Sequence, residues 1–153
     1  MQNINQIKID IGNPSMKGQL YPYYDLEAEI LELTNSIEEN WPYGIDIDGT
    51  IIFDFDKKFI LSNVDILVPK KYWKIKDKLE IPLPTKKGIL IIKNQSLEKK
   101  SFNLPIEITR DKANKYVKII FDKRNNYSKV IELSNKVYAL LRNKNLNGFF
   151  VHF

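Results

Sequence analysis

The pattern that decides the fold lies in the stretch Ile45-Asp46-Ile47-Asp48-Gly49-Thr50-Ile51-Ile52-Phe53-Asp54-Phe55-Asp56. Beyond the glycine, its apolar side chains Ile51, Phe53 and Phe55 fall on one face and its acids fall on the other. A period of two is typical of a β-strand with one buried face. The Asp48-Gly49 pair is typical of a hairpin turn. The stretch therefore predicts two antiparallel strands with solvent-facing acids.

Strands dominate the rest of the chain as well. Alternating or short apolar runs bounded by Gly, Pro and Asn predict strands at residues 7–11, 59–68, 88–93, 104–109, 116–121 and 149–153. Residues 28–33 fit either a strand or a short helix. Pro82 and Pro84 exclude a central strand from their segment.

One segment, residues 127–142, has helical spacing. Val130, Leu133, Val137 and Leu141 recur at intervals of three and four, and an asparagine before them suits a helix N-cap. We therefore expect an α+β fold: a mainly antiparallel sheet packed by one long C-terminal helix at about 127–142. The 153 residues, of which 43% are hydrophobic, fit a single domain.

Charge divides the chain at Pro69. Residues 1–68 carry twelve acids and four lysines, a net charge of −8, whereas residues 69–153 carry a net charge of +13. We expect an acidic β-rich lobe over 1–68 and a basic α+β lobe over 69–153. Such asymmetry concerns partners rather than fold. No signal peptide and no membrane-spanning run is visible, and there is no cysteine, which fits the cytoplasm.

The segment from Asp46 to Ile51 resembles the first motif of haloacid-dehalogenase-type phosphatases. The resemblance implies that Asp46 is a nucleophile, that Asp48 is the acid/base, and that both help to hold Mg²⁺. The family also needs a buried strand before the motif and a Gly-Asp pair after it, and this chain has neither. We expect no catalytic residue here, and metal-dependent phosphotransfer is the third hypothesis.

A second resemblance covers residues 22–67. Its segments are Tyr24-Asp25-Leu26-Glu27-Ala28-Glu29-Ile30-Leu31-Glu32-Leu33, Gly44-Ile45-Asp46, Ile51-Ile52-Phe53-Asp54-Phe55-Asp56 and Val64-Asp65-Ile66-Leu67. In order and spacing they look like the small bacterial domain of unknown function 2283. The resemblance implies a compact β-rich unit and no particular activity.

Ligand chemistry is sparse in this sequence. His152 is the only histidine, the six glycines are dispersed, and no EF-hand loop is present. Five acids could gather around a hard cation, but alternation on a solvated sheet face explains them: Asp46, Asp48, Asp54, Asp56 and Asp65. We therefore expect no cofactor, no metal and no enzyme.

Exposed charge instead favours non-catalytic protein binding. Small strand-rich bacterial proteins often serve as immunity proteins or antitoxins, which block the active site of a toxin; that step is an analogy. On this hypothesis a cationic toxin docks on acids of the first lobe, namely Glu38, Glu39, Asp46, Asp48, Asp54 and Asp56. The sequence does not indicate an oligomeric state.

The alternative partner is nucleic acid, bound by the basic segment 69–124. Its candidate residues place two aromatic rings among lysines, namely Lys70, Lys71, Tyr72, Trp73 and Lys74. Such rings stack on bases while lysines meet phosphates. Arginine, which base recognition favours, is scarce in the chain, and no known nucleic-acid-binding motif is present.

Overall fold

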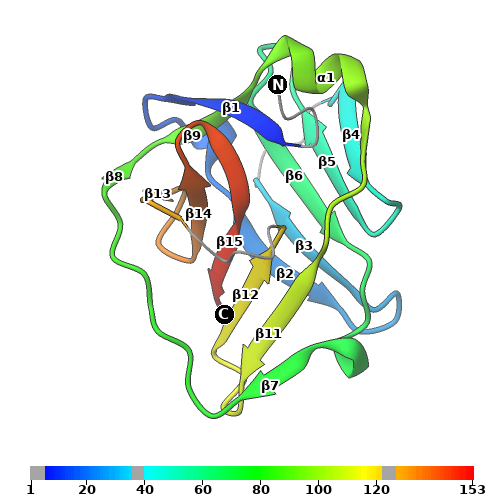
Figure 1. Cartoon of the computed structure of the whole chain (residues 1–153), viewed down its shortest axis with the longest axis vertical. Helices are drawn as coiled ribbons and strands as arrows, with labels where there is room; N and C mark the ends of the chain where they lie inside the picture. The colour runs from blue at the N-terminus through cyan, green and yellow to red at the C-terminus, as the bar shows by residue number, and fades with distance from the viewer. Residues whose placement is uncertain (1–5, 36–39, 122–126) are drawn as a thin grey trace.

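The computed structural model describes residues 6–35, 40–121 and 127–153, which form two β-sheets packed face to face (Figure 1). The first sheet has six strands in the order β10-β4-β5-β6-β3-β2. Their bounds are β2 (Tyr21–Asp25), β3 (Ile30–Thr34), β4 (Tyr43–Ile47), β5 (Ile51–Phe55), β6 (Leu61–Ile66) and β10 (Ser101–Phe102). Neighbouring strands are antiparallel except β10, which runs parallel to β4.

The second sheet has nine strands. Seven follow the order β7-β11-β12-β15-β14-β13-β8, and β1 links β15 to β9. Their bounds are β1 (Ile7–Gly12), β7 (Lys74–Lys76), β8 (Lys86–Lys87), β9 (Ile89–Ile92), β11 (Glu107–Asp111), β12 (Tyr116–Ile120), β13 (Lys129–Glu132), β14 (Val137–Arg142) and β15 (Asn145–His152).

Helical structure is short. Within the described ranges the only α-helix is α1 (Asn94–Lys99), and two single 3₁₀ turns are η1 (Met16–Gly18) and η2 (Lys70–Tyr72). The protein is therefore mainly β rather than α+β. The strands expected at 7–11, 88–93 and 116–121 are confirmed as β1, β9 and β12.

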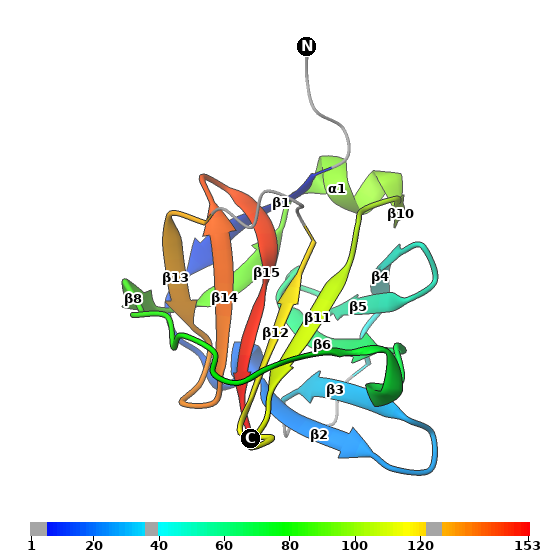
Figure 2. The same ribbon diagram turned by 60° about the horizontal axis from the view of Figure 1, so that its bottom comes forward.

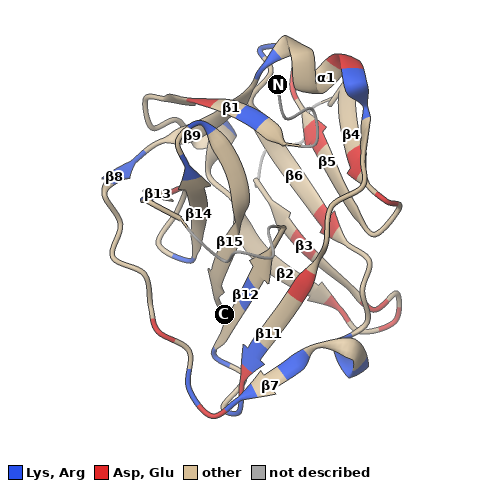
Figure 3. Ribbon diagram, in the orientation of Figure 1, with Lys and Arg blue, Asp and Glu red and all other residues tan. Residues whose placement is uncertain are grey.

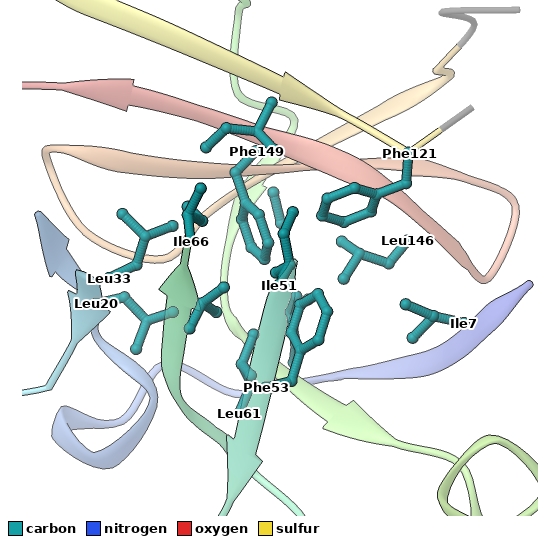
Figure 4. Packing of buried hydrophobic residues seen from close by; sticks show 14 of the residues in the cluster. Ile7, Leu20, Leu33, Ile51, Phe53, Leu61, Ile66, Phe121, Leu146 and Phe149 are labelled. Carbon is teal, nitrogen blue, oxygen red and sulfur yellow. The ribbon is translucent and has the colours of Figure 1, made fainter. Parts of the chain in front are cut away.

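The core lies between the two sheets, as the alternating stretch predicts. Ile51, Phe53 and Phe55 of β5 are buried and face the nine-stranded sheet. The ring of Phe53 packs against Phe121 and Phe149, with centroids 5.9 and 6.2 Å away (Figure 4). The apolar face of each strand thus supplies the contacts that join the sheets.

The prediction of a long helix over residues 127–142 is wrong. This segment forms β13 and β14, an antiparallel hairpin in the nine-stranded sheet. One face of the hairpin joins the main core, while Val130 and Leu140 on the other face pack in a second cluster with Leu79. A strand buried on both faces has no apolar–polar alternation, so its apolar run resembles that of a helix.

The charge boundary coincides with a change of sheet. The acidic half supplies five of the six strands of the first sheet, and beyond Pro69 the chain crosses to the second sheet. Two strands break this rule, because β1 lies in the nine-stranded sheet and β10 lies in the six-stranded sheet. The two halves of the chain are therefore interleaved.

Lysines mark the two ends of the seven-strand path of the nine-stranded sheet. The edge strand β7 carries Lys74 and Lys76, and the opposite edge strand β8 consists of Lys86 and Lys87 (Figure 3). Charged edge strands resist pairing with the edges of other molecules. Edge protection therefore accounts for two of the lysine clusters.

Candidate functional site: the acidic outer face of the six-stranded sheet

Acidic side chains line up across the outer face of the six-stranded sheet. The strand register places one cross-strand row in the order Ser101, Asp46, Ile52, Asp65, Glu32 and Tyr23. In an adjacent row Asp54 lies between Gly44 and Asn63. We call Glu32, Asp46, Asp54 and Asp65 the acidic face; each is half-buried, and their neighbours along the strands are buried. Figure 3 shows acidic positions in red on β3, β4, β5 and β6.

Like charges are crowded on this face. Glu32 and Asp65 lie directly opposite each other on β3 and β6. Burial raises the pKa of Glu32, and the carboxylates of Asp65 and Asp25 raise it further. Burial also raises the pKa of Asp54; the Nδ2 of Asn63, which donates to Asp54 Oδ2 at 3.1 Å, opposes this effect, and Asp65 adds to it. The free protein therefore holds these carboxylates in an unfavourable arrangement.

No basic side chain that the structure describes forms an ion pair with the acidic face. Among the residues that the structure describes, no ion pair involves Glu32, Asp46, Asp54 or Asp65. Four acids outside this face have lysine partners: Glu107 with Lys74 (3.3 Å), Glu132 with Lys87 (3.7 Å), Asp77 with Lys112 (3.1 Å), and Asp10 with Lys93 (3.0 Å) and Lys144 (3.5 Å). Among the described residues the exposed acids Glu27, Glu29 and Asp48 are in no ion pair either, so the four acids of this face differ from them in being half-buried together on one sheet face.

The predicted hairpin at Asp48-Gly49 is confirmed. Asp48 and Gly49 have φ of 49° and 69°, and the N–H of Thr50 donates to the carbonyl of Ile47 at 2.9 Å. These are the features of a two-residue turn with positive φ at both central residues. Asp48 is exposed at this turn, at the end of the sheet rather than within the acidic face.

Asp56, a predicted docking residue, is buried with only 3% of its surface exposed. Its Oδ1 accepts hydrogen bonds from the N–H groups of Lys58 (2.8 Å) and Ile60 (3.0 Å), which fixes the turn between β5 and β6. Asp56 therefore has a structural role in this turn. Glu38 and Glu39, also predicted, lie outside the described residues.

Glu32 was missed as a docking candidate, and Asp65 was noted only as a possible cation ligand. The alternation of each strand places these acids on a polar face, but it does not reveal that β3 and β6 are neighbours. Only the pairing register brings the two carboxylates together.

The basic candidates do not form a stacking platform. Trp73 is buried, and its Nε1 donates to the carbonyl of Val68 at 2.8 Å. The ammonium group of Lys70 lies 4.4 Å from the centre of the Tyr24 ring, so this lysine covers a tyrosine of the protein itself. Of the two predicted rings, Tyr72 alone is open to solvent, with 67% of its surface exposed.

A cavity of about 280 Å³ lies between the β4–β5 turn and the start of β11. Most of its lining is apolar, and it includes Leu104 and Ile108. Asp48 and Tyr72, which belong to different predicted sites, both border this cavity. One residue predicted to bind a protein partner and one predicted to bind nucleic acid therefore line the same cavity.

Asp46, the nucleophile of the phosphotransfer hypothesis, accepts local hydrogen bonds. Its Oδ1 accepts from the N–H of Gly49 and from the hydroxyl of Ser101, both at 3.3 Å. In the part of the chain that the structure describes, no group of His, Cys, Asp and Glu side chains is arranged to hold a metal ion. Phosphotransfer stays an untested prediction.

Comparison with known proteins does not assign the chain to a family. No family model matches the chain, and no curated protein matches it significantly. The likeness of residues 22–67 to domain of unknown function 2283 therefore stays a prediction. None of the helices in the described ranges is long and apolar enough to cross a membrane.

We expect Glu32→Gln to stabilise the protein at neutral pH by up to about 1 kcal/mol, because it removes one of two opposed like charges. Folding raises the pKa of Glu32. Between the pKa of the unfolded chain and the raised pKa of the folded chain, the folded chain keeps a proton that the unfolded chain has released. The stability of the wild type therefore falls as pH rises through this range. The gain should therefore vanish below about pH 4, where both states are protonated.

Urea denaturation of the wild type and the variant across pH measures this effect. Glu107→Gln is the matched control, because Glu107 is a strand glutamate paired with Lys74. A neutral-pH gain of the same size in both variants would show that crowding on the acidic face is not the cause.

Proposed function

We propose that this protein is a non-catalytic binding protein that docks a cationic protein partner on its acidic face. The observation that carries the proposal is the set of four half-buried carboxylates on one sheet face, none of which forms an ion pair with a basic side chain in the described ranges. An arrangement that lowers the stability of the free protein is typical of a functional surface.

A basic partner would reverse the electrostatic penalty. Its arginine or lysine side chains would place positive charge between Glu32, Asp65 and Asp54; the carboxylate of Asp65 contributes to the raised pKa of both Glu32 and Asp54. The same charge would accelerate the encounter of the two proteins. Exposed Tyr21 and Tyr23 border the face on β2, and tyrosine is enriched at protein interfaces.

The partner class that we infer is a toxin, which makes this chain an immunity protein or antitoxin. A nuclease-type toxin binds the phosphates of its substrate through a cationic cleft, and an acidic sheet face has the complementary charge. Blocking that cleft requires no catalytic residue in this chain. The inference of toxin inhibition rests on charge complementarity and on analogy with other small strand-rich proteins.

A triple isosteric variant tests the acidic face. We expect Glu32→Gln with Asp54→Asn and Asp65→Asn to weaken binding of the native partner at least tenfold while raising thermal stability. The opposite signs follow because the carboxylates repel one another in the free protein and attract the partner in the complex. The partner is obtained by affinity purification from the native host, and its affinity is measured by calorimetry at low and physiological salt.

The matched control removes the same charge from the other sheet. It combines Asp77→Asn, Glu107→Gln and Glu132→Gln, three acids that have lysine partners. We expect less than a twofold change in affinity for this control. Equal weakening by both triple variants would mean that net charge alone governs binding, and the acidic face would lose its assignment.

Nucleic acid is the second candidate partner, favoured by one observation: Tyr72 is exposed, with the ammonium group of Lys71 5.3 Å from its ring centre. If nucleic acid rather than protein co-purifies, and Tyr72→Ala with Lys71→Glu releases it, the basic segment is the binding site. In that case affinity should fall steeply with salt.

A further inference from the structure

The strand β2 ends the six-stranded sheet with an unpaired edge. Among the described residues β2 pairs only with β3, so one side of Tyr21–Asp25 has no strand partner (Figure 2). The other end of this sheet is the two-residue strand β10, and α1 lies against β4 there. The strands β7 and β8, at the two ends of the seven-strand path of the nine-stranded sheet, carry lysines, whereas β2 carries none.

The register identifies which backbone groups face the open side. Just beyond β3, the N–H of Asn35 donates to the carbonyl of Ser62 in β6. Backbone groups of alternate residues point to the same side of a strand, so Leu31 and Leu33 also direct their backbone groups to β6. The backbone groups of Glu32 and of the residues two positions before and after it therefore bond to β2, at Tyr21, Tyr23 and Asp25.

The remaining residues of β2, Pro22 and Tyr24, turn their backbone groups outward. Proline has no N–H, and it is tolerated in an edge strand where that position faces away from the sheet. The open edge thus offers the carbonyl of Pro22 together with the N–H and carbonyl of Tyr24. These are the groups that an added strand pairs with.

The charges beside this edge indicate which kind of added strand would bind there. Tyr21 and Tyr23 are 39% and 60% exposed on the outer face, and Glu32 lies directly opposite Tyr23. Asp25 ends the strand, and Glu27 and Glu29 in the adjoining turn are exposed. An added strand with basic side chains at alternate positions would place them beside the tyrosine rings and these acids, which suits arginine.

We propose that an extended segment of the cationic partner, with arginine at every second position, adds to the edge of β2 as a further strand. This inference rests on the proposed function and specifies how the partner binds. Backbone hydrogen bonds to Pro22 and Tyr24 align the segment, and its arginines continue the cross-strand row that contains Tyr23, Glu32 and Asp65.

Three synthetic peptides test the proposal on the full chain. The parent peptide has eight residues that alternate arginine and threonine; one analogue is N-methylated at every arginine, and the other is N-methylated at every threonine. All three have the same charge. Only one set of N–H groups faces β2, so one analogue should bind at least tenfold more weakly than the parent and the other should bind equally.

The identity of the weak analogue gives the direction of the added strand. In antiparallel pairing the residues that bond to Pro22 and Tyr24 share their inner face, so methylated threonine disrupts binding; in parallel pairing methylated arginine does. Hydrogen exchange gives a second readout. The amide of Tyr24 should exchange more slowly in the complex, and that of Tyr23, which already bonds to β3, should not change.

The remaining outcomes overturn the inference. Equal binding of all three peptides would show that charge alone holds the partner. Loss of binding by both analogues, or no binding by the parent, would also contradict strand addition. None of these outcomes bears on the triple carboxylate variant, which tests the acidic face with the native partner and so judges the proposed function separately.

Discussion

Phe53→Ala should lower the free energy of unfolding by about 3–5 kcal/mol, the range for truncating a buried phenylalanine. The side chain of Phe53 is fully buried, and it contacts Phe121 and Phe149 of the opposite sheet. Its removal would leave a cavity at the contact between the sheets. Chemical denaturation followed by tryptophan fluorescence measures the loss.

The control is Ile52→Ala on the same strand. Ile52 is half-buried on the outer face, so its truncation removes little core packing, and we expect a loss of less than about 1.5 kcal/mol. Similar losses in the two variants would contradict the assignment of Phe53 to the contact between the sheets.

Gly148→Ala is expected to lower the free energy of unfolding by about 3 kcal/mol or more, at the upper end of the range for overpacking. Gly148 lies in β15, opposite Ile120 of β12 and Leu140 of β14. A Cβ atom at this position would overlap the carbonyl oxygen of Ile119, which belongs to the backbone and cannot rotate away.

Gly49→Asn is the matched control for this substitution. Gly49 has a φ of 69°, which asparagine tolerates, and a Cβ there meets no atom within 4 Å. We expect its melting temperature to change by only a few degrees, whereas Gly148→Ala should lower it by more than about 10 °C. A well-folded Gly148→Ala protein with wild-type stability would contradict the strand order around β15.

Alternation predicted the strands of the acidic half because the outer face of the six-stranded sheet is polar. In β5, for example, Phe53 is apolar and lies on the buried face, whereas Asp54 is polar and lies on the outer face. The segment 127–142 has no such contrast, because its outer face is also buried: Val130 and Leu140 pack there with Leu79.

The candidate site was predictable only in part, for a related reason. Asp46 and Asp54 lie where alternation places them. Asp56 does not, because the register between β5 and β6 shifts after Asp54 and the chain turns, which draws the Asp56 carboxylate inward to bind backbone N–H groups. The contribution of Glu32 depends on long-range pairing, which a single sequence does not encode in any local pattern.

The pairing of β1 with β15 has a consequence for biosynthesis. Ile7 of β1 lies opposite Leu146 of β15, so the pairing of β1 is complete only after β15 has been synthesised. The hairpins β2–β3, β4–β5 and β5–β6 close locally and form early, whereas contacts between distant segments form slowly. Until β15 is synthesised, the apolar face around Phe53 has no complete sheet to cover it. A nascent chain stalled before Asn145 should therefore bind chaperones and be sensitive to proteases, although the strands from β1 to β14 are already made.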